Sequence, residues 1–106
     1  MATVKIPGGW SEPKPATPQI QGYADEVKPQ VERKIGRNLE TYKAVLYAEQ
    51  VVAGRNYLIK IDTGGPGTSY VHVLLFVTLQ NVVEFRDAWD GLGKDSPLEP
   101  PKQTTT

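Results

Sequence analysis

Apolar positions between Thr17 and Gly36 recur every three or four residues. They are Ile20, Tyr23, Ala24, Val27, Val31 and Ile35. This spacing places them on one face of a helix of about 3.6 residues per turn. Thr17 is a good helix-capping residue, Pro18 suits the first turn, and Gly36 is a residue type that ends helices. The pattern predicts one long amphipathic helix. Pro29 removes an intrahelical hydrogen bond and predicts a bend at residues 24–28.

From residue 42 onward the hydrophobic pattern changes to that of strands. Segments rich in β-branched and aromatic residues cover 42–52, 55–63, 70–79 and 82–89. In the second segment, Tyr57, Ile59 and Ile61 point to one face of the strand. Leu58 and Lys60 point to the opposite face. A helix followed by three or four antiparallel strands predicts an α+β fold, in which the helix covers one face of the sheet.

The two ends of the chain contain little apolar sequence. Residues 1–16 include Pro7, Gly8, Gly9, Pro13 and Pro15, which is typical of an exposed arm whose first residues are flexible. Residues 91–106 are mostly Gly, Pro, Lys and Thr, and we expect a disordered tail there. The folded domain is therefore expected at residues 17–90.

Composition excludes several classes of protein. A length of 106 residues allows one compact domain. Twelve basic and twelve acidic side chains give no net charge, so we expect no nucleic-acid partner. The absence of cysteine excludes disulfides and thiolate metal sites. No segment approaches the ~18 apolar residues of a membrane span, and no signal peptide is apparent, so we expect a cytoplasmic protein without membrane contact.

The sequence contains no recognisable catalytic arrangement. His72 is the single histidine, and it lies inside a predicted strand without a cysteine or serine partner. We interpret the carboxylate pairs Asp87 with Asp90 and Asp25 with Glu26 as surface charge. A metal site requires several converging ligands. We therefore expect no enzyme activity, no metal and no cofactor.

Residues 50–54, Gln-Val-Val-Ala-Gly, differ from an ordinary hairpin turn. Val51 and Val52 lead directly into Ala53 and Gly54, so apolar side chains occupy the tip in place of Asn, Asp or Ser. An exposed apolar tip is commonly buried by a partner. The alternative is that both valines end a strand and pack beneath it, and the pattern alone favours neither interpretation.

The same five positions match the Q-x-V-x-G motif of the cystatin superfamily, in the form common in stefins. Further segments resemble an A-type stefin in order and spacing, and the resemblance covers about residues 6–79. These segments are residues 6–9, 11–18, 27–30, 56–60 and 70–79. The chain is thus identified as a member of the stefin (type 1 cystatin) family. The resemblance implies a cystatin-like α+β fold, with one long helix packed against a four- to five-stranded antiparallel sheet.

The resemblance also implies a function. Stefins are reversible, tight-binding competitive inhibitors of papain-like cysteine proteases such as cathepsins. They present a wedge with three contact points, formed by an N-terminal arm and two hairpin loops. In this sequence the corresponding protease-binding residues are Pro7, Gly8 and Gly9 in the arm, Gln50, Val51, Val52, Ala53 and Gly54 in the first hairpin, and Leu79, Gln80 and Asn81 in the second.

The sequence departs from the family after Leu79. Gln80 replaces the usual proline, and residues 80–89 do not follow the family's polar loop. One alternative is therefore a stefin scaffold whose second hairpin binds another protein, and another is that these residues simply form the last strand. The apolar residues concerned are Val82, Val83, Phe85 and Trp89. Trp10 either contacts a target or folds back on the helix.

The expected partners are papain-like cysteine proteases, bound by a monomer. Val51 and Val52 lie in a hinge that allows the helix and first strands to exchange between two chains, giving a domain-swapped dimer. Such a dimer would extend the first hairpin into a continuous strand. We would therefore expect the dimer to lack the central inhibitory loop.

Overall fold

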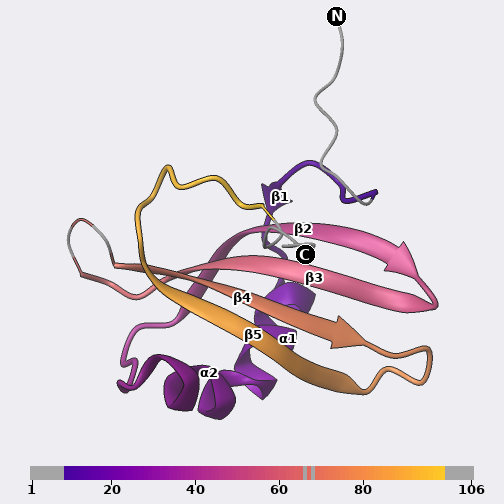
Figure 1. Ribbon diagram of the computed structural model, residues 1–106, viewed down its shortest axis with the longest axis horizontal. Coiled ribbons are helices and arrows are strands. Elements are labelled where there is room, and N and C mark those ends of the chain that lie inside the picture. Colours follow the sequence, from indigo (N-terminus) through magenta and orange to yellow (C-terminus); the bar gives the residue numbers. More distant parts are fainter. Residues whose placement is uncertain (1–8, 66, 68, 100–106) are drawn as a thin grey trace, which may run out of the picture.

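The computed structural model forms a five-stranded antiparallel sheet with two consecutive helices on one face (Figure 1). It describes residues 9–65, 67 and 69–99. In chain order the elements are β1 (Lys14–Pro15), α1 (Pro18–Glu26), α2 (Lys28–Ile35), β2 (Lys43–Val52), β3 (Gly54–Asp62), β4 (Tyr70–Val77) and β5 (Val83–Leu92). The strands lie in the sheet in the order in which they occur in the chain. The predicted α+β class with a cystatin-like sheet is confirmed.

The predicted long helix is divided in two at Val27. Its start is as expected, because the Thr17 hydroxyl accepts a hydrogen bond from the Ile20 N–H at 3.2 Å. Val27 has φ −101° and ψ 6° and separates α1 from α2. Pro29 in the first turn of α2 has no N–H to continue the ladder of α1, which explains the break at the predicted bend. α2 ends at Gly36, with φ +80°.

The main hydrophobic core lies between the helices and the inner face of the sheet. Tyr57, Ile59 and Ile61 of β3 pack in it, as their alternation predicted. Their buried partners are Ile20 and Ala24 on α1, Val27 between the helices and Val31 on α2, and those on β4 are Val71, Val73, Leu75 and Val77. Burying these side chains removes a large apolar area from water, which is the main favourable contribution to folding.

The outer face of the sheet carries a second, smaller cluster, which we call the outer cluster. Ala48, Leu58 and Leu98 are buried in it, and the partly buried members are Trp10, Leu46, Leu74 and Trp89. Trp10 therefore packs on the face opposite the helices, so the alternative in which it folds back on the helix is wrong. Residues 14–15 of the arm also form β1, a strand that the sequence did not predict.

The expectation of a disordered tail from residue 91 is wrong for residues 91–99. β5 continues to Leu92, and Leu98 is only 5% exposed. The ammonium of Lys60 donates to the carbonyls of Lys94 and Ser96 at 2.5 and 2.8 Å. The composition of this segment is typical of disorder, but burial of one leucine and two hydrogen bonds from the sheet hold it in place. Residues 100–106 lie outside the described residues.

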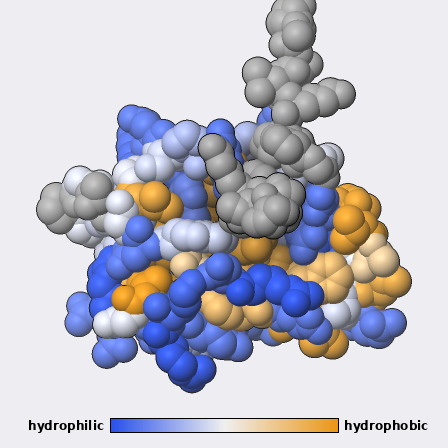
Figure 2. Space-filling view, in the orientation of Figure 1, coloured by the Kyte–Doolittle hydropathy of each residue, from blue (hydrophilic) through white to orange (hydrophobic). Residues whose placement is uncertain are grey.

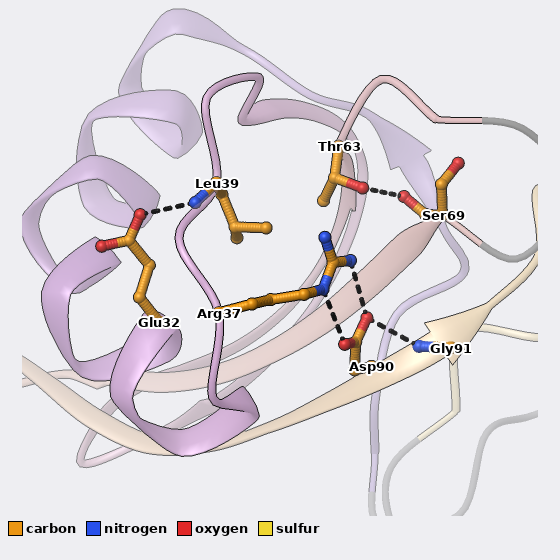
Figure 3. A network of polar contacts seen from close by, with 7 residues as sticks. All are labelled: Glu32, Arg37, Leu39, Thr63, Ser69, Asp90 and Gly91. Carbon is orange, nitrogen blue, oxygen red and sulfur yellow. Dashed lines mark hydrogen bonds and ion pairs between the residues drawn. The ribbon is translucent and has the colours of Figure 1, made fainter.

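Polar contacts fix the loop after α2 to the end of β5 (Figure 3). The guanidinium of Arg37 donates two hydrogen bonds of 3.0 Å to the Asp90 carboxylate, and this pairing lowers the pKa of Asp90. Asp90 also accepts from the Gly91 N–H at 2.8 Å. The Glu32 carboxylate accepts from the Leu39 N–H at 2.8 Å. The interpretation of Asp90 as a surface charge is therefore refined, because it joins the loop after α2 to the sheet.

A candidate protein-binding end of the sheet

Two hairpins lie side by side at one end of the sheet (Figure 1). In the first, Val52 pairs with Gly54, so Ala53 occupies the tip. The second follows β4, whose last residue Val77 pairs with Arg55 on β3 and with Val83 on β5. Val77 is thus level with the start of β3 and with the start of β5. The turns of the two hairpins therefore lie at the same end of the sheet.

Gly54 allows the two hairpins to approach closely. Its φ is +114°, which side chains rarely tolerate. A Cβ atom at this position would lie 2.6 Å from Phe76 Cζ and 2.7 Å from the Val77 carbonyl oxygen. β4 thus packs directly onto the bare backbone of β3. The glycine of the motif therefore has a structural role, which is to hold the second hairpin against the first.

Exposed apolar side chains gather over this end of the molecule. Val51 is 68% exposed, Val52 48%, Leu79 72% and Val82 54%. They are the exposed large hydrophobic residues of the described part of the chain, and Figure 2 shows hydrophobic surface over the same end. The two valines of the first hairpin end β2 without packing beneath it, which decides between the two interpretations left open by the sequence. A contiguous apolar surface of this kind is typical of a protein-binding site.

The second hairpin keeps a defined turn although Gln80 replaces proline. The Thr78 hydroxyl accepts hydrogen bonds from the N–H groups of Gln80 and Val82, at 3.2 and 3.0 Å. The Thr78 N–H donates to the Val82 carbonyl at 2.9 Å. Asn81 has φ +67°, a conformation that asparagine tolerates better than most residues. The loop is thus held by its own hydrogen bonds, with the side chain of Leu79 projecting from it.

The N-terminal arm runs along the edge of β2 toward the first hairpin. β1 pairs Pro15 with Leu46 and Lys14 with Tyr47 in antiparallel register. Farther along, the Ser11 N–H donates to the Glu49 carbonyl at 2.8 Å. This direction carries Gly9, which has φ +81°, toward the exposed valines. Pro7 and Gly8, the other two predicted arm residues, lie outside the described residues.

The apolar residues after the second hairpin mostly serve the fold. Val83 and Phe85 pack against the main core, and Trp89 packs in the outer cluster. Only Val82 of the four candidate anchors is largely exposed. The interpretation that these residues form the last strand is therefore confirmed for Val83, Phe85 and Trp89, since β5 spans Val83–Leu92, whereas Val82 precedes the strand.

The described residues show no alternative chemistry that the sequence overlooked. His72 is 4% exposed, and burial together with nearby Lys60 lowers its pKa to about 4, so the imidazole is neutral at pH 7. Within the described ranges, no three His, Cys, Asp or Glu side chains come together in a way that would bind a metal ion. Neither helix in the described part of the chain has the length and apolar content needed to cross a bilayer.

Comparison with known proteins identifies the family. The model of the family described as Cystatin domain matches residues 8–73. Cystatin-A8 of Sus scrofa is 48% identical over 79 residues, covering 74% of this chain and 75% of that protein. Leukocyte cysteine proteinase inhibitor 1 of Sus scrofa is 49% identical over 74 residues, 70% of each chain. Cystatin-A of Homo sapiens is 50% identical over 74 residues, 70% of this chain and 74% of that protein. This chain belongs to the cystatin family, and within it to the type 1 cystatins, or stefins, of the A type.

Proposed function

We propose that this protein is a reversible, tight-binding competitive inhibitor of papain-like cysteine proteases, including cathepsins. The observation that carries the proposal is the apolar end of the sheet, where the side chains of Val51, Val52 and Leu79 are exposed. Membership of the cystatin family supports it, as does a relative named leukocyte cysteine proteinase inhibitor 1. A cystatin is an inhibitor and not an enzyme. The proposed action is therefore to block the active-site cleft of the protease without forming a covalent bond.

The proposed wedge has three contact points. Residues 7–9 of the arm would occupy one side of the cleft, where glycine lets the backbone pass close to the protease nucleophile. The first hairpin, with Val51 to Ala53 at its tip, would fill the centre. The second hairpin would add Leu79, Gln80 and Asn81. An interface of about 1,600 Å² is sufficient for tight binding when the loops are preorganised, since little conformational entropy is then lost.

Two further expectations about this inhibitor remain predictions. A cytoplasmic location follows from the absence of cysteine and from the family resemblance. The active form is expected to be the monomer, since a domain-swapped dimer hinged at Val51 and Val52 would lose the turn at Ala53.

Titration of papain with the purified protein tests the proposal. We expect stoichiometric loss of peptidase activity that recovers on dilution or on competition by substrate, because the complex is non-covalent. The same titration of cathepsin L extends the test to a cathepsin. Full activity of both proteases at micromolar concentrations of the protein would contradict the proposal.

Val51→Asp is expected to weaken inhibition of papain at least about tenfold, equivalent to about 1.4 kcal/mol, because docking would bury an unpaired carboxylate. Val51 is 68% exposed, so stability should change little. Asn38→Asp is the matched control, since Asn38 is also exposed and the substitution makes the same change in charge. Asn38 lies in the loop before β2, at the opposite end of that strand. Equal inhibition by both variants would show that the first hairpin is not in the contact.

A further inference from the structure

The outer cluster joins three separate parts of the chain. Trp10 comes from the N-terminal arm, Leu98 from the C-terminal segment, and the remaining members from the sheet. Ala48 and Leu58, which are paired across β2 and β3, are both 0% exposed although they lie on the face away from the helices. Something other than the helices must therefore cover them. In the described residues, the arm and the segment 93–99 contribute side chains to this cluster from outside the sheet.

The C-terminal segment is fastened to the sheet by a buried ammonium group. Lys60 is 3% exposed, and its Nζ donates to the carbonyls of Lys94 and Ser96 at 2.5 and 2.8 Å. The segment also closes a turn on itself, because the Gly93 N–H donates to the Ser96 hydroxyl at 2.9 Å. A buried charge is costly unless hydrogen-bonded, so detaching these carbonyls would leave the ammonium without those partners. The position of Leu98 is therefore well defined.

From Gly9 onward, where the structure describes the arm, its other attachments to the sheet are short. β1 has only two residues, one of them Pro15, which has no N–H to donate. Other hydrogen bonds to β2 run from the Ser11 N–H to the Glu49 carbonyl at 2.8 Å, from the Glu49 N–H to the Ser11 hydroxyl at 3.0 Å and from the Ala16 N–H to the Val45 carbonyl at 3.0 Å. Trp10 comes directly before Ser11 and forms an isolated β-bridge of its own, and Gly9 precedes it. Packing of its indole in the outer cluster thus fixes the point from which the protease-binding end of the arm begins.

We propose that the segment 93–99 is a positioning element for the N-terminal arm. Leu98 completes the apolar surface on which Trp10 packs, and Trp10 in turn holds Gly9 at the level of the first hairpin. The arm thereby enters a complex already aligned, and less ordering entropy is lost on binding. The consequence for protease binding rests on the proposed function, whereas the placement of the arm by Leu98 does not.

Leu98→Ala tests the placement directly through hydrogen exchange of the Ser11 amide, measured by NMR. We expect exchange about tenfold faster than in the wild type, equivalent to about 1.4 kcal/mol of lost protection. Leu39→Ala is the matched control, because Leu39 is 3% exposed and Leu98 5%, but Leu39 packs in the main core. This control should lower global stability and leave local opening of the arm unchanged. Leu98→Met should restore protection, since methionine preserves most of the apolar volume.

Unchanged exchange at Ser11 in Leu98→Ala would overturn the proposal. The same holds if Leu39→Ala accelerates this amide as much, because the effect would then be general destabilisation. Either result is obtained without a protease, so it is independent of the inhibitory function.

Dissociation from papain provides the second measurement. We expect Leu98→Ala to raise the dissociation rate constant about tenfold with a much smaller change in the association rate constant, as is usual for changes within one interface. Trp10→Ala should have a similar effect, and the double variant should add little because both changes free the same arm. If the wild type inhibits papain and Leu98→Ala dissociates at the wild-type rate, the segment does not position the arm for binding. If the wild type does not inhibit, the proposed function fails while the exchange experiment still decides the placement.

Discussion

Gly54→Ala is expected to lower the free energy of unfolding by about 3 kcal/mol or more. The left-handed φ of +114° costs an alanine about 1–2 kcal/mol. The added Cβ would also lie 2.6 Å from Phe76 Cζ and 2.7 Å from the Val77 carbonyl oxygen. The phenyl ring can turn aside, but the carbonyl belongs to the β3–β4 pairing and cannot move without disturbing it. Overpacking of this kind costs about 1–3 kcal/mol.

Urea denaturation of Gly54→Ala and Gly91→Ala separates the two contributions. Gly91 has φ +73°, but a Cβ atom there would have no atom of the described residues within 4 Å, so its substitution should cost only the backbone strain of about 1–2 kcal/mol. Adding Phe76→Ala to Gly54→Ala should recover little stability, because the contact with the Val77 carbonyl remains. Equal losses in the two single variants would show that the close approach of β4 is unimportant.

The motif glycine illustrates what the sequence could predict about the site. Residues 50–54 were recognised from an unusual apolar hairpin tip and from their resemblance to a family motif, and the structure exposes Val51 and Val52 as a binding tip requires. Gly54 was included with them as a contact residue. Its close approach to Phe76 depends on a neighbouring strand that is distant in sequence. The residues next to Gly54 in the sequence therefore could not predict this structural role.

Elements with a strong local signal were the ones predicted correctly. Pro29 breaks the helical hydrogen-bond ladder wherever it occurs, so the bend followed from the sequence. The alternation of Tyr57, Ile59 and Ile61 likewise placed them on the core face of β3. The two-residue strand β1 has no such signal, because Lys14 and Pro15 are poor strand formers that pair only because β2 offers a free edge.

The C-terminal segment was mispredicted for a related reason. Its composition is polar, and a single leucine gives no periodic pattern. Leu98 is buried only because the outer face of the sheet already presents Ala48 and Leu58. The sequence did indicate that Leu58 points away from the helix, and a large apolar residue on that face requires a cover. It did not indicate which part of the chain provides that cover.

His72 should make the protein less stable as the pH falls from about 6.5 to about 4. Burial and the neighbouring Lys60 lower the pKa of the folded imidazole from 6.5 to about 4. Between these values the unfolded chain binds a proton that the native protein does not, so protonation favours unfolding. Below about pH 4 both states are protonated and this loss is complete. This lowering of the pKa corresponds to a loss of roughly 3 kcal/mol in the free energy of unfolding.

The surroundings of His72 explain why its protonation is unfavourable. Its partner across the β3–β4 pairing is Lys60, a cation whose hydrogen bonds go to the backbone of the C-terminal segment. The ring of Tyr70 lies 5.8 Å from the same ammonium. His72 Nε2 is buried and has no hydrogen-bond partner among the residues that the structure describes. A proton there would place a second charge beside Lys60, where desolvation is already costly.

Urea denaturation of the wild type and of His72→Phe at several pH values between 7 and 4 measures this contribution. His72→Phe should flatten the decline, since phenylalanine has no titrating group and no hydrogen bond from Nε2 is lost. Asp87 and Asp90 have pKa values lowered from 3.8 by Lys34 and Arg37. The stability that these two ion pairs contribute is present above pH 3.8, the ordinary pKa of the carboxyl group. It is lost only as the pH falls below that value. Asp90→Asn should therefore lower the free energy of unfolding at all these pH values but leave its decline between pH 6.5 and pH 4 intact. A full slope in His72→Phe would mean that some other group titrates in this range, and that the buried imidazole does not destabilise the protein in acid.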